Sequence, residues 1–451
     1  MNYLSGTSLP VYDKHTQERM ATITTASAHD MTDAIAVGHH AIPACRALPG
    51  YERQRILRHI VAGIRDKQAL FIKLLSQEVG KTMSEAENEV NRAIDTFTIA
   101  AEESVRIGGE TLPMDRSPRG HQKWGMTRRF PVGLCALIAP FNFPLNLAAH
   151  KIAPAIAAGC PFILKPASAT PMSALLLKDI LATAGLPPGS WAILPASRDV
   201  ADQLVTDPRI ALLSFTGSPE MGWDMKRRAG KKKVVLELGG NAACIVDETA
   251  DLDTAIPKIV AGAFAQAGQS CISVQRLYVH ETLFQDAIVQ LSGLAKHVQV
   301  GPMISIAAAE RLITWITDAI AAGAACHCGA SREGAHVRPT VLSGVSEKSP
   351  LSCQEAFGPV VSISSFRQFE DALAAVNASR FGLQAGVFTN RLDRAHQAWE
   401  TLDVCGVIVQ DVPALRFDHM PYGGIKDSGF GREGIRYAIQ EDYTYEKILV
   451  Y

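Results

Sequence analysis

The fold is decided by a stretch that reads VGLCALIAP (132–140), LAAHKIAPAIAAG (147–159), CPFILKP (160–166), SALLLKDILATAG (173–185), WAILPA (191–196), ADQLVTD (201–207) and IALLSFTG (210–217). Short continuous apolar runs bounded by turn residues are typical of buried strands, and the longer segments between them have helical spacing. Strands that alternate with helices predict βαβ units around a parallel sheet, with right-handed crossovers.

A second alternating block begins at NAACIVDE (241–248). It continues through a helix near 254–266, the strand RLYVH (276–280), helices near 283–294 and 307–322, and the strand VVSISSF (360–366). Upstream of both blocks, residues 27–104 carry apolar positions at three- and four-residue spacing, which predicts several amphipathic helices. No repeat or low-complexity linker separates the blocks. We therefore expect two packed α/β lobes with a hinge-like crossing at 237–241, where a cleft forms.

Two polar, strand-like segments belong to neither block: HQKWGMTRRF (121–130) and YTYEKILVY (443–451). Such segments predict a protruding hairpin or an edge strand, and edge strands pair with other chains. We therefore expect a homodimer or homotetramer. The predicted domains comprise residues 1–112 and 133–240 in one lobe, 241–430 in the other, and oligomerisation strands at 113–132 and 436–451.

Composition excludes several classes of function. With 44 Lys and Arg against 45 Asp and Glu, the chain has no long-range field to attract nucleic acid or an anionic membrane. It has neither an apolar run of membrane-spanning length nor a signal-peptide pattern, so we expect a cytoplasmic protein. Nine cysteines without a paired CxxC framework suit a reducing compartment. Cys326-His327-Cys328 lacks a second thiol pair nearby, and no metal site is predicted.

The chemistry depends on the cysteine of GQSC (268–271). An isolated cysteine is usually a core residue, so a base, an oxyanion donor and an electron acceptor are needed beside Cys271. Such partners occur in PFNFP (140–144), FTGS (215–218) and ELGGN (237–241). With ILKPAS (163–168), EAFGPV (355–360) and PYGGIKDSGFGRE (421–433) in this order, the chain resembles the aldehyde dehydrogenase superfamily from about residue 92 onward.

The resemblance implies a Rossmann-like parallel-sheet cofactor domain, a second α/β catalytic domain and a small β oligomerisation element. It makes Cys271 the nucleophile, Asn142 the side-chain donor to the oxyanion, Glu237 the general base and Glu433 a possible proton relay. A thiolate that adds to an aldehyde gives an oxyanion that needs fixed donors. The thiohemiacetal then loses hydride to the nicotinamide, and the thioester is hydrolysed by water that Glu237 activates, helped by a cleft that raises its pKa.

The cofactor region contains no GxGxxG fingerprint. Instead, Gly217 and Ser218 lie in a strand-to-helix turn whose helix N-terminus suits a pyrophosphate, with Gly222 one turn on. Many NAD-preferring relatives carry Glu where this chain has Ser168, and a serine does not repel a 2′-phosphate, so NAD or NADP is expected, with NADP at least as well suited. The resemblance implies the following cofactor contacts: Ala139, Pro140, Phe141, Lys165, Ser168, Gly217, Ser218, Leu238, Glu355 and Phe357.

The aldehyde tunnel of the family matches Arg92, Phe143, His150, Ser270, Ile272, Arg416, Asp418 and His419. Because unpaired buried charge is costly, the two arginines either meet an anionic substrate group or pair with carboxylates such as Asp418. Their positions resemble those in non-phosphorylating glyceraldehyde-3-phosphate and phosphonoacetaldehyde dehydrogenases. Ser270 replaces an arginine of the former, so lactaldehyde or a semialdehyde stays open as the substrate.

Two other functions remain open. One is an acylating enzyme that transfers the acyl group to coenzyme A, and the presence of Glu237 argues against it. The other is a catalytically silent binding or structural relative, because fold does not imply function. A further departure from the family is the loop at 295–305, which is shorter than in relatives and is expected to lie away from the chemistry.

Overall fold

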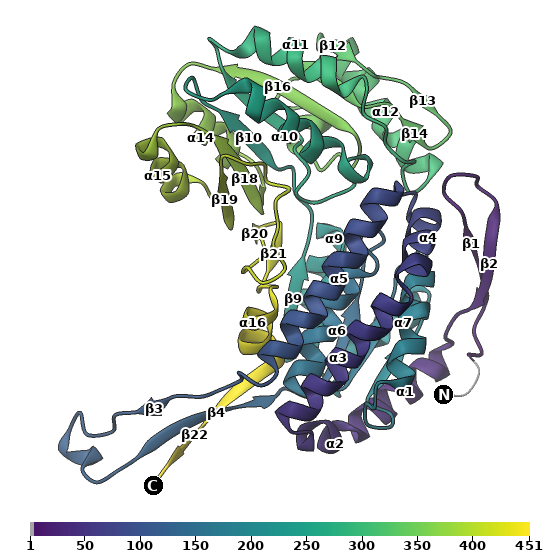
Figure 1. Cartoon of the computed structure of the whole chain (residues 1–451), viewed down its shortest axis with the longest axis vertical. Coiled ribbons are helices and arrows are strands. Elements are labelled where there is room, and N and C mark those ends of the chain that lie inside the picture. Colours follow the sequence, from purple (N-terminus) through teal and green to yellow (C-terminus); the bar gives the residue numbers. More distant parts are fainter. Residues whose placement is uncertain (1–3) are drawn as a thin grey trace.

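A computed structural model describes residues 4–451 as two α/β lobes with a projecting arm (Figure 1). One lobe contains a six-stranded sheet, the other a seven-stranded sheet, and the arm a three-stranded sheet. The predicted fold class is confirmed. Within the described residues, no helix combines the length and the apolar character needed to cross a membrane.

Four of the six strands of the first sheet come from the alternating stretch 132–217, as predicted. Its strands run in the order β21-β9-β8-β5-β6-β7, parallel except for β21, which is antiparallel to β9. The strands are β5 (Leu134–Ile138), β6 (Phe162–Lys165), β7 (Trp191–Ile193), β8 (Ile210–Thr216), β9 (Lys233–Glu237) and β21 (Gly429–Phe430). The crossovers are α6 (Asn146–Ala158), α7 (Met172–Thr183), α8 (Arg198–Thr206) and α9 (Pro219–Arg228).

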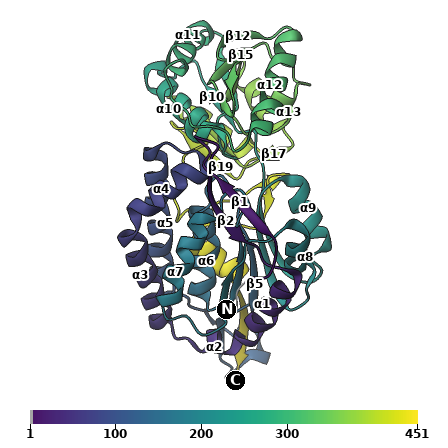
Figure 2. The ribbon, with the colours of Figure 1, turned by 90° about the vertical axis from the view of Figure 1, so that its right-hand side faces the viewer.

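Alternate residues of each strand face opposite sides of this sheet, so each side carries its own core. In β5, Cys135 and Leu137 join one core, whereas Leu134, Ala136 and Ile138 join the other. Helices cover both sides (Figure 2). The first side is covered by α3 (Gly50–Asp66), α4 (Gln68–Val79), α5 (Met83–Glu103), α6 and α7, and the second by α1 (Ala28–His40), α8 and α9. Residues 27–104 are therefore helical as predicted, including the short α2 (Ile42–Ala47); a hairpin of β1 (Ser8–Tyr12) and β2 (Arg19–Thr24) precedes them.

The second sheet follows the order β12-β15-β16-β11-β10-β18-β19, with only β12 antiparallel. Its strands are β10 (Ala243–Val246), β11 (Arg276–His280), β12 (Ala325–Cys328), β15 (Thr340–Ser343), β16 (Val360–Phe366), β18 (Gln384–Phe388) and β19 (Gly406–Val409). Its helices are α10 (Leu252–Phe264), α11 (Phe284–Ala295), α12 (Ile306–Ala321), α13 (Pro350–Cys353), α14 (Phe369–Asn377) and α15 (Leu392–Thr401). Smaller elements are η2 (Ala265–Gly268), β13 (Arg332–Glu333), β14 (His336–Val337), β17 (Phe381–Gly382) and β20 (Ile425–Lys426).

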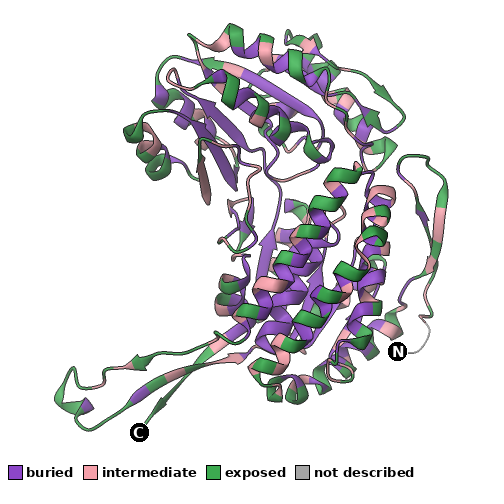
Figure 3. Cartoon of the chain, in the orientation of Figure 1, coloured by how far each residue is buried: buried purple, intermediate pink, exposed green. Residues whose placement is uncertain are grey.

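The arm joins segments from opposite ends of the chain. β22 (Thr444–Val450) pairs antiparallel with β4 (Gly125–Pro131), which also pairs with β3 (Thr111–Leu112). The arm projects from the first lobe, and much of it is exposed (Figure 3). The 3₁₀ turn η1 (Pro118–Gly120) lies between β3 and β4 in the chain. The helix α16 (Ile435–Ala438) and the π-helical turn η3 (Ile439–Tyr443) lead into β22.

Two features of the arrangement place the site. The chain crosses between the lobes directly after β9, at the predicted hinge. It returns through residues 425–430, where β21 joins the first sheet beside β9. The predicted boundary assigned residues 429–430 to the second lobe, and their pairing with β9 assigns them to the first sheet instead.

Candidate active site

Cys271 lies in the loop between α10 and β11, and the backbone before it has an uncommon shape. Gln266, Ala267 and Gly268 have φ angles of 57°, 52° and 67°. Left-handed backbone at a residue other than glycine costs on the order of 1–3 kcal/mol and persists where the surroundings impose it. One such constraint is visible, because the N–H of Gln266 donates to Glu85 Oε1 at 2.5 Å. The loop is therefore held in a shape that the isolated chain disfavours.

Gly240 lets the ELGGN segment pass directly against this loop. A Cβ at Gly240 would lie 2.2 Å from the carbonyl oxygen of Cys271, which is shorter than any real contact. Only glycine fits there. The motif that follows β9 and the motif that carries the cysteine are thus brought together at the crossing between the lobes.

Asn142 and Cys271 line one cavity of about 970 Å³. Asn142 is buried, and its Nδ2 donates to the carbonyl oxygen of Gln269 at 2.9 Å. The side chain of Gln269 in turn accepts from the N–H of Ile304 at 2.8 Å. The loop at 295–305, expected to lie away from the chemistry, therefore contacts the residue two positions before Cys271. The two segments are 35 positions apart, and their contact is not evident from the sequence.

Glu237 is buried at the end of β9, and neither of its carboxylate oxygens has a hydrogen-bond partner within residues 4–451. Burial, together with the negative charge of Glu433, raises its pKa well above the ordinary value, although Arg416, Lys151 and Arg432 oppose the shift. Burial therefore favours the neutral form of Glu237. An unpartnered carboxyl group has free capacity to hold a water molecule.

Glu433 is in the opposite state. It forms ion pairs with Lys151 at 3.1 Å and with Arg416 at 3.0 Å. Burial opposes its ionisation, but Lys151 and Arg416 outweigh burial and lower its pKa to about 2. A carboxylate this acidic carries no proton at neutral pH. The relay role of Glu433 stays a prediction, and the contacts support a different task, which is to hold Arg416.

Tyr422 is a residue that sequence reasoning missed. Its hydroxyl lies 3.2 Å from Sγ of Cys271, and Tyr422 is buried. The PYGG motif contains this tyrosine, but nothing in the local pattern indicates that it faces a cysteine 151 positions away. Burial is the main cause that raises the pKa of the Cys271 thiol to about 12, and the Tyr422 hydrogen bond opposes that rise.

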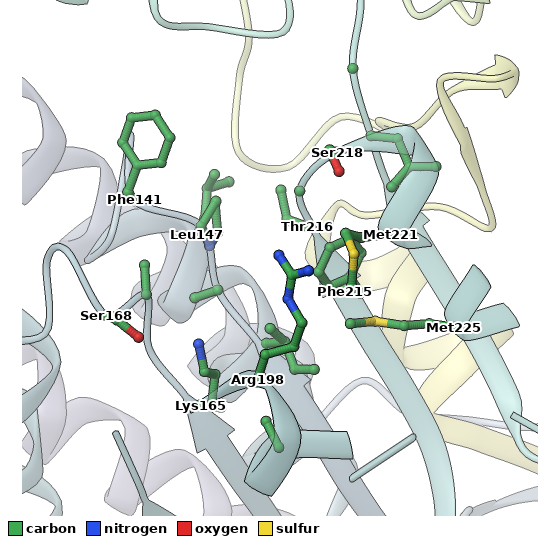
Figure 4. Close-up of a pocket in the computed structure, with 18 of the residues that line it drawn as sticks. Phe141, Leu147, Lys165, Ser168, Arg198, Phe215, Thr216, Ser218, Met221 and Met225 are labelled. Carbon is green, nitrogen blue, oxygen red and sulfur yellow. The ribbon is translucent and has the colours of Figure 1, made fainter. Parts of the chain in front are cut away.

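All ten predicted cofactor residues line the same cavity as Cys271. Figure 4 shows Lys165, Ser168 and Arg198 reaching into one region of it. Arg198 was not predicted, because an arginine at the start of a helix is usually a solvated surface residue. Burial and the nearby charge of Arg198 lower the pKa of Lys165. Within the described chain, neither cation has a salt-bridge partner, which suits an anionic ligand group.

The rest of the cavity is shaped by α9 and the 355–357 segment. A Cβ at Gly222 would lie 2.3 Å from Leu238 Cδ2, so glycine allows α9 to approach β9 closely. Phe357 adopts a φ of 48° and its ring packs edge-on against Phe141, with centroids 5.7 Å apart. Glu355 accepts from the N–H of Gly240 at 2.9 Å, and burial raises its pKa to about 7.

The predicted substrate residues divide into two groups. Arg92, Arg416, Asp418 and His419 line a second cavity of about 450 Å³, whereas Phe143, His150, Ser270 and Ile272 do not. Phe143 instead packs beneath the ammonium of the buried Lys81, 3.9 Å from its ring centroid. Ile272 packs with Leu383 and Tyr422 in a small apolar cluster, and Ser270 Oγ accepts from the N–H of Ile272 at 3.4 Å.

Both arginines are paired. Arg92 Nη2 lies 2.7 Å from Asp418 Oδ1 and its Nε donates to Oδ2 at 3.2 Å, which is the pairing that the sequence left open. Asp418 also contacts His150 Nε2 at 2.8 Å. Burial and the charge of Arg416 lower the pKa of His150, which favours the neutral imidazole. Arg416 pairs with Glu433 rather than with Asp418.

Comparison with known proteins agrees with this arrangement. The profile of the Aldehyde dehydrogenase family matches residues 3–449. The chain is 39% identical to the 3-sulfolactaldehyde dehydrogenase of Priestia aryabhattai, over 98% of this chain and 94% of that protein. A crystal structure of aldehyde dehydrogenase 21 from Physcomitrella patens, in complex with the reaction product succinate, is 45% identical with a TM-score of 0.97, covering 99% and 95% of the two chains.

A third similar protein is the glyceraldehyde-3-phosphate dehydrogenase GapN from Methanocaldococcus jannaschii, whose crystal structure contains NADP. It is 33% identical, with a TM-score of 0.95 and full coverage of both chains. Family profile, relatives and fold agree over nearly the whole length. With a cysteine and an asparagine at one cavity between two α/β lobes, the chain belongs to the aldehyde dehydrogenase family.

Proposed function

We propose that this enzyme oxidises a small anionic aldehyde to its carboxylate through a thioester on Cys271, with NADP as the preferred cofactor. One observation carries the proposal: Cys271 and Asn142 line the same cavity as every predicted cofactor residue. That cavity fits a nicotinamide dinucleotide. The cavity is large, and the N-terminus of α9 lies at its wall. Two cations that have no salt-bridge partner in the described residues line it.

The first step is addition of the Cys271 thiolate to the aldehyde carbon. The oxyanion that forms needs donors fixed in advance. The Asn142 amide carries two N–H bonds, and one is held by the carbonyl of Gln269. That bond orients the amide, so its second N–H is available to the oxyanion together with the backbone N–H of Cys271. The chemistry that a bound nicotinamide supplies is acceptance of hydride from the thiohemiacetal carbon.

The second step is hydrolysis of the thioester on Cys271. Glu237 takes a proton from the attacking water, which requires its ionised form. Because its pKa is raised, Glu237 ionises at higher pH than an ordinary glutamate, and we expect kcat to rise with pH where hydrolysis limits turnover. Unlike Glu433, Glu237 has no ion pair or hydrogen bond in residues 4–451 to compete for its oxygens. Transfer of the acyl group to coenzyme A would not need this carboxylate.

The preference for NADP is supported by the region around Ser168. A serine lacks the charge that would repel a 2′-phosphate, and Lys165 and Arg198 reach into the same part of the cavity (Figure 4). Charge-assisted hydrogen bonds, such as those from two cations to a phosphate dianion, are among the strongest hydrogen bonds in proteins. The M. jannaschii relative was crystallised with NADP.

The preference for an anionic aldehyde is supported by the 450 Å³ cavity on the substrate side. Arg92 and Arg416 line it, and Nε of Arg416 is buried without a hydrogen-bond partner in the described chain. The guanidinium of Arg92 is partly exposed, so it can take a carboxylate or sulfonate oxygen in addition to its bond to Asp418. One similar protein is named for an anionic aldehyde, 3-sulfolactaldehyde, and another was crystallised with the reaction product succinate. We therefore infer a three- or four-carbon aldehyde with a sulfonate or carboxylate at its far end.

We also propose that the arm of β3, β4 and β22 joins copies of the chain. It exposes large apolar side chains on Trp124, Met126, Ile448 and Leu449. Edge strands with apolar residues favour pairing with another chain. Light scattering of the purified enzyme would give the mass, and truncation of residues 444–451 should produce monomers.

The proposed reaction is tested by a panel of aldehydes with NAD and with NADP. Succinate semialdehyde and 3-sulfolactaldehyde represent the anionic class, and lactaldehyde and propanal the neutral class. We expect the carboxylic acid at an equal rate with and without coenzyme A, and the highest kcat/KM for an anionic aldehyde with NADP. Cys271→Ala should abolish turnover. Full activity of that variant, or an acyl-coenzyme A product, would contradict the mechanism.

A further inference from the structure

The hydroxyl of Tyr422 faces the nucleophile and has no other visible task. It lies 3.2 Å from Sγ of Cys271, and within residues 4–451 neither atom has a second hydrogen-bond partner. Tyr422 lines neither the cofactor cavity nor the substrate cavity. A buried hydroxyl is usually hydrogen-bonded because an unsatisfied one is costly. Here that bond goes to the reacting sulfur.

Several contacts hold Tyr422 in place. Its backbone forms a bridge with Glu433, with N···O distances of 3.0 Å and 2.6 Å in the two directions. The guanidinium of Arg416 lies over its ring, 3.6 Å from the centroid, and Arg416 is itself tied to Glu433. A fixed cation therefore covers one face of the ring, and the hydroxyl contacts the sulfur. A cation stacked on an aromatic face at this distance makes a favourable electrostatic contact.

We propose that Tyr422 is a further catalytic residue, whose hydroxyl donates a hydrogen bond to the Cys271 thiolate. The inference rests on the proposed role of Cys271 as nucleophile. A thiolate has no proton, so when Cys271 ionises only the tyrosine can be the donor. The S–H proton leaves for water in the cofactor cavity, which Cys271 lines. The hydroxyl keeps its own proton, because burial raises the pKa of Tyr422 well above its ordinary value.

The charged groups near the sulfur explain why such a donor is needed. Burial is the largest of the influences that raise the pKa of the thiol to about 12, and Glu355 and Glu237 act in the same direction. The Tyr422 hydroxyl and the charge of Arg416 lower the pKa of the thiol. A sulfur in this environment depends on them for its reactive form, since the thiolate is the nucleophile.

The test measures alkylation of the free enzyme, without substrate, as a function of pH. The wild type and Tyr422→Phe are treated with iodoacetamide from pH 6 to pH 10, and modification of the peptide that contains Cys271 is followed by mass spectrometry. Peptide resolution is needed because Cys326 and Cys353 are exposed. We expect Cys271 to be alkylated about tenfold more slowly in Tyr422→Phe at every pH of this range, which corresponds to a rise of about one unit in the thiol pKa.

Tyr443→Phe is the matched control. Tyr443 is also buried, and its hydroxyl has no hydrogen-bond partner in the described residues, so its loss should leave the Cys271 profile unchanged. Thermal unfolding of both variants separates a folding defect from a change in the thiol. If Tyr422→Phe folds like the wild type and its alkylation profile does not move, or moves to lower pH, the proposal is wrong.

This outcome is distinguishable from failure of the proposed function. Alkylation reports the thiol alone, whereas the aldehyde panel reports the reaction. A Tyr422→Phe enzyme with an unchanged thiol profile would overturn the role of Tyr422 and leave aldehyde oxidation intact. An active Cys271→Ala enzyme would overturn the nucleophile, and with it both proposals.

Discussion

Two cavities, the proposed substrate site and the proposed cofactor site, are each lined by two cations, and the two pairs of cations are in opposite states. On the substrate side, Arg92 is paired with Asp418 at 2.7 Å and Arg416 with Glu433 at 3.0 Å. On the cofactor side, Lys165 and Arg198 line the large cavity, and neither forms a salt bridge within residues 4–451.

The difference follows from burial. Arg416 and Glu433 are nearly inaccessible, and an unpaired charge there would be very costly. Lys165 is only partly buried and Arg198 is exposed, so water can solvate both until a ligand arrives. The substrate-side cations therefore serve the structure first, whereas the cofactor-side cations are available for binding. Four predictions test this contrast.

The largest expected effect is on stability, at the substrate side. Glu433→Gln leaves Arg416 and Lys151 buried without their shared carboxylate, so we expect the free energy of unfolding to fall by about 3–5 kcal/mol, measured by denaturant unfolding. The matched change on the cofactor side is Lys165→Met, which removes a cation without a partner and should alter stability by no more than about 0.5 kcal/mol. Equal losses in both variants would refute the contrast.

The next effect is on cofactor binding. Lys165→Ala and Arg198→Ala each remove a donor to the proposed 2′-phosphate, worth roughly 1.5–3 kcal/mol for a hydrogen bond to a charged group. We expect KM for NADP to rise about ten- to a hundredfold, with little change for NAD, in steady-state assays at saturating aldehyde. A parallel rise for both cofactors would mean that these cations bind the pyrophosphate or only shape the cavity.

A smaller effect is expected for Arg92, because its charge is already shared with Asp418. Arg92→Ala should raise KM for an anionic aldehyde roughly fivefold, about 1 kcal/mol, and leave KM for propanal unchanged, a pattern of lost substrate binding. Asp418→Asn is the informative companion, since it frees the guanidinium. If Asp418→Asn lowers KM for the anionic aldehyde, internal pairing and substrate binding compete for Arg92.

The smallest effect is a change in pH dependence. The pKa of Glu433 is held at about 2, below the usual glutamate value of 4.5. The stability that this depression contributes is present above pH 4.5 and is lost as the pH falls through 4.5 toward 2. Glu433→Gln should therefore lose less unfolding free energy between pH 5 and pH 3 than the wild type. Urea unfolding at pH 5, 4 and 3 measures the two slopes, and identical slopes would exclude an ion-paired Glu433.

Sequence reasoning reached the elements and the motifs, and missed contacts between distant segments. The strands RLYVH and VVSISSF occur at the residues predicted for them, since strand periodicity is local. Tyr422 and Arg198 were not identified. Neither residue type is unusual at its position, and only the folded chain brings Tyr422 to Cys271, 151 positions away.

The loop at 295–305 was misplaced for the same reason, because its contact with Gln269 joins segments 35 positions apart. The predicted pairing of Arg92 with Asp418 succeeded only as one of two alternatives. Those residues are 326 positions apart, and a sequence cannot state which of several carboxylates an arginine will meet.

By itself, the sequence determined the two α/β lobes, the arm, and the small residues that let the nucleophile loop pass the crossing. The lobes and the arm follow from the spacing of apolar residues. The glycines are required where neighbouring backbone leaves no room for a Cβ. The tertiary structure alone decided which charges are paired, which stay open to a ligand, and that a tyrosine hydroxyl meets the sulfur. Apolar burial depends on position along one element, whereas ion pairs and hydrogen bonds require atoms within about 3 Å, a precision that arises only when elements pack.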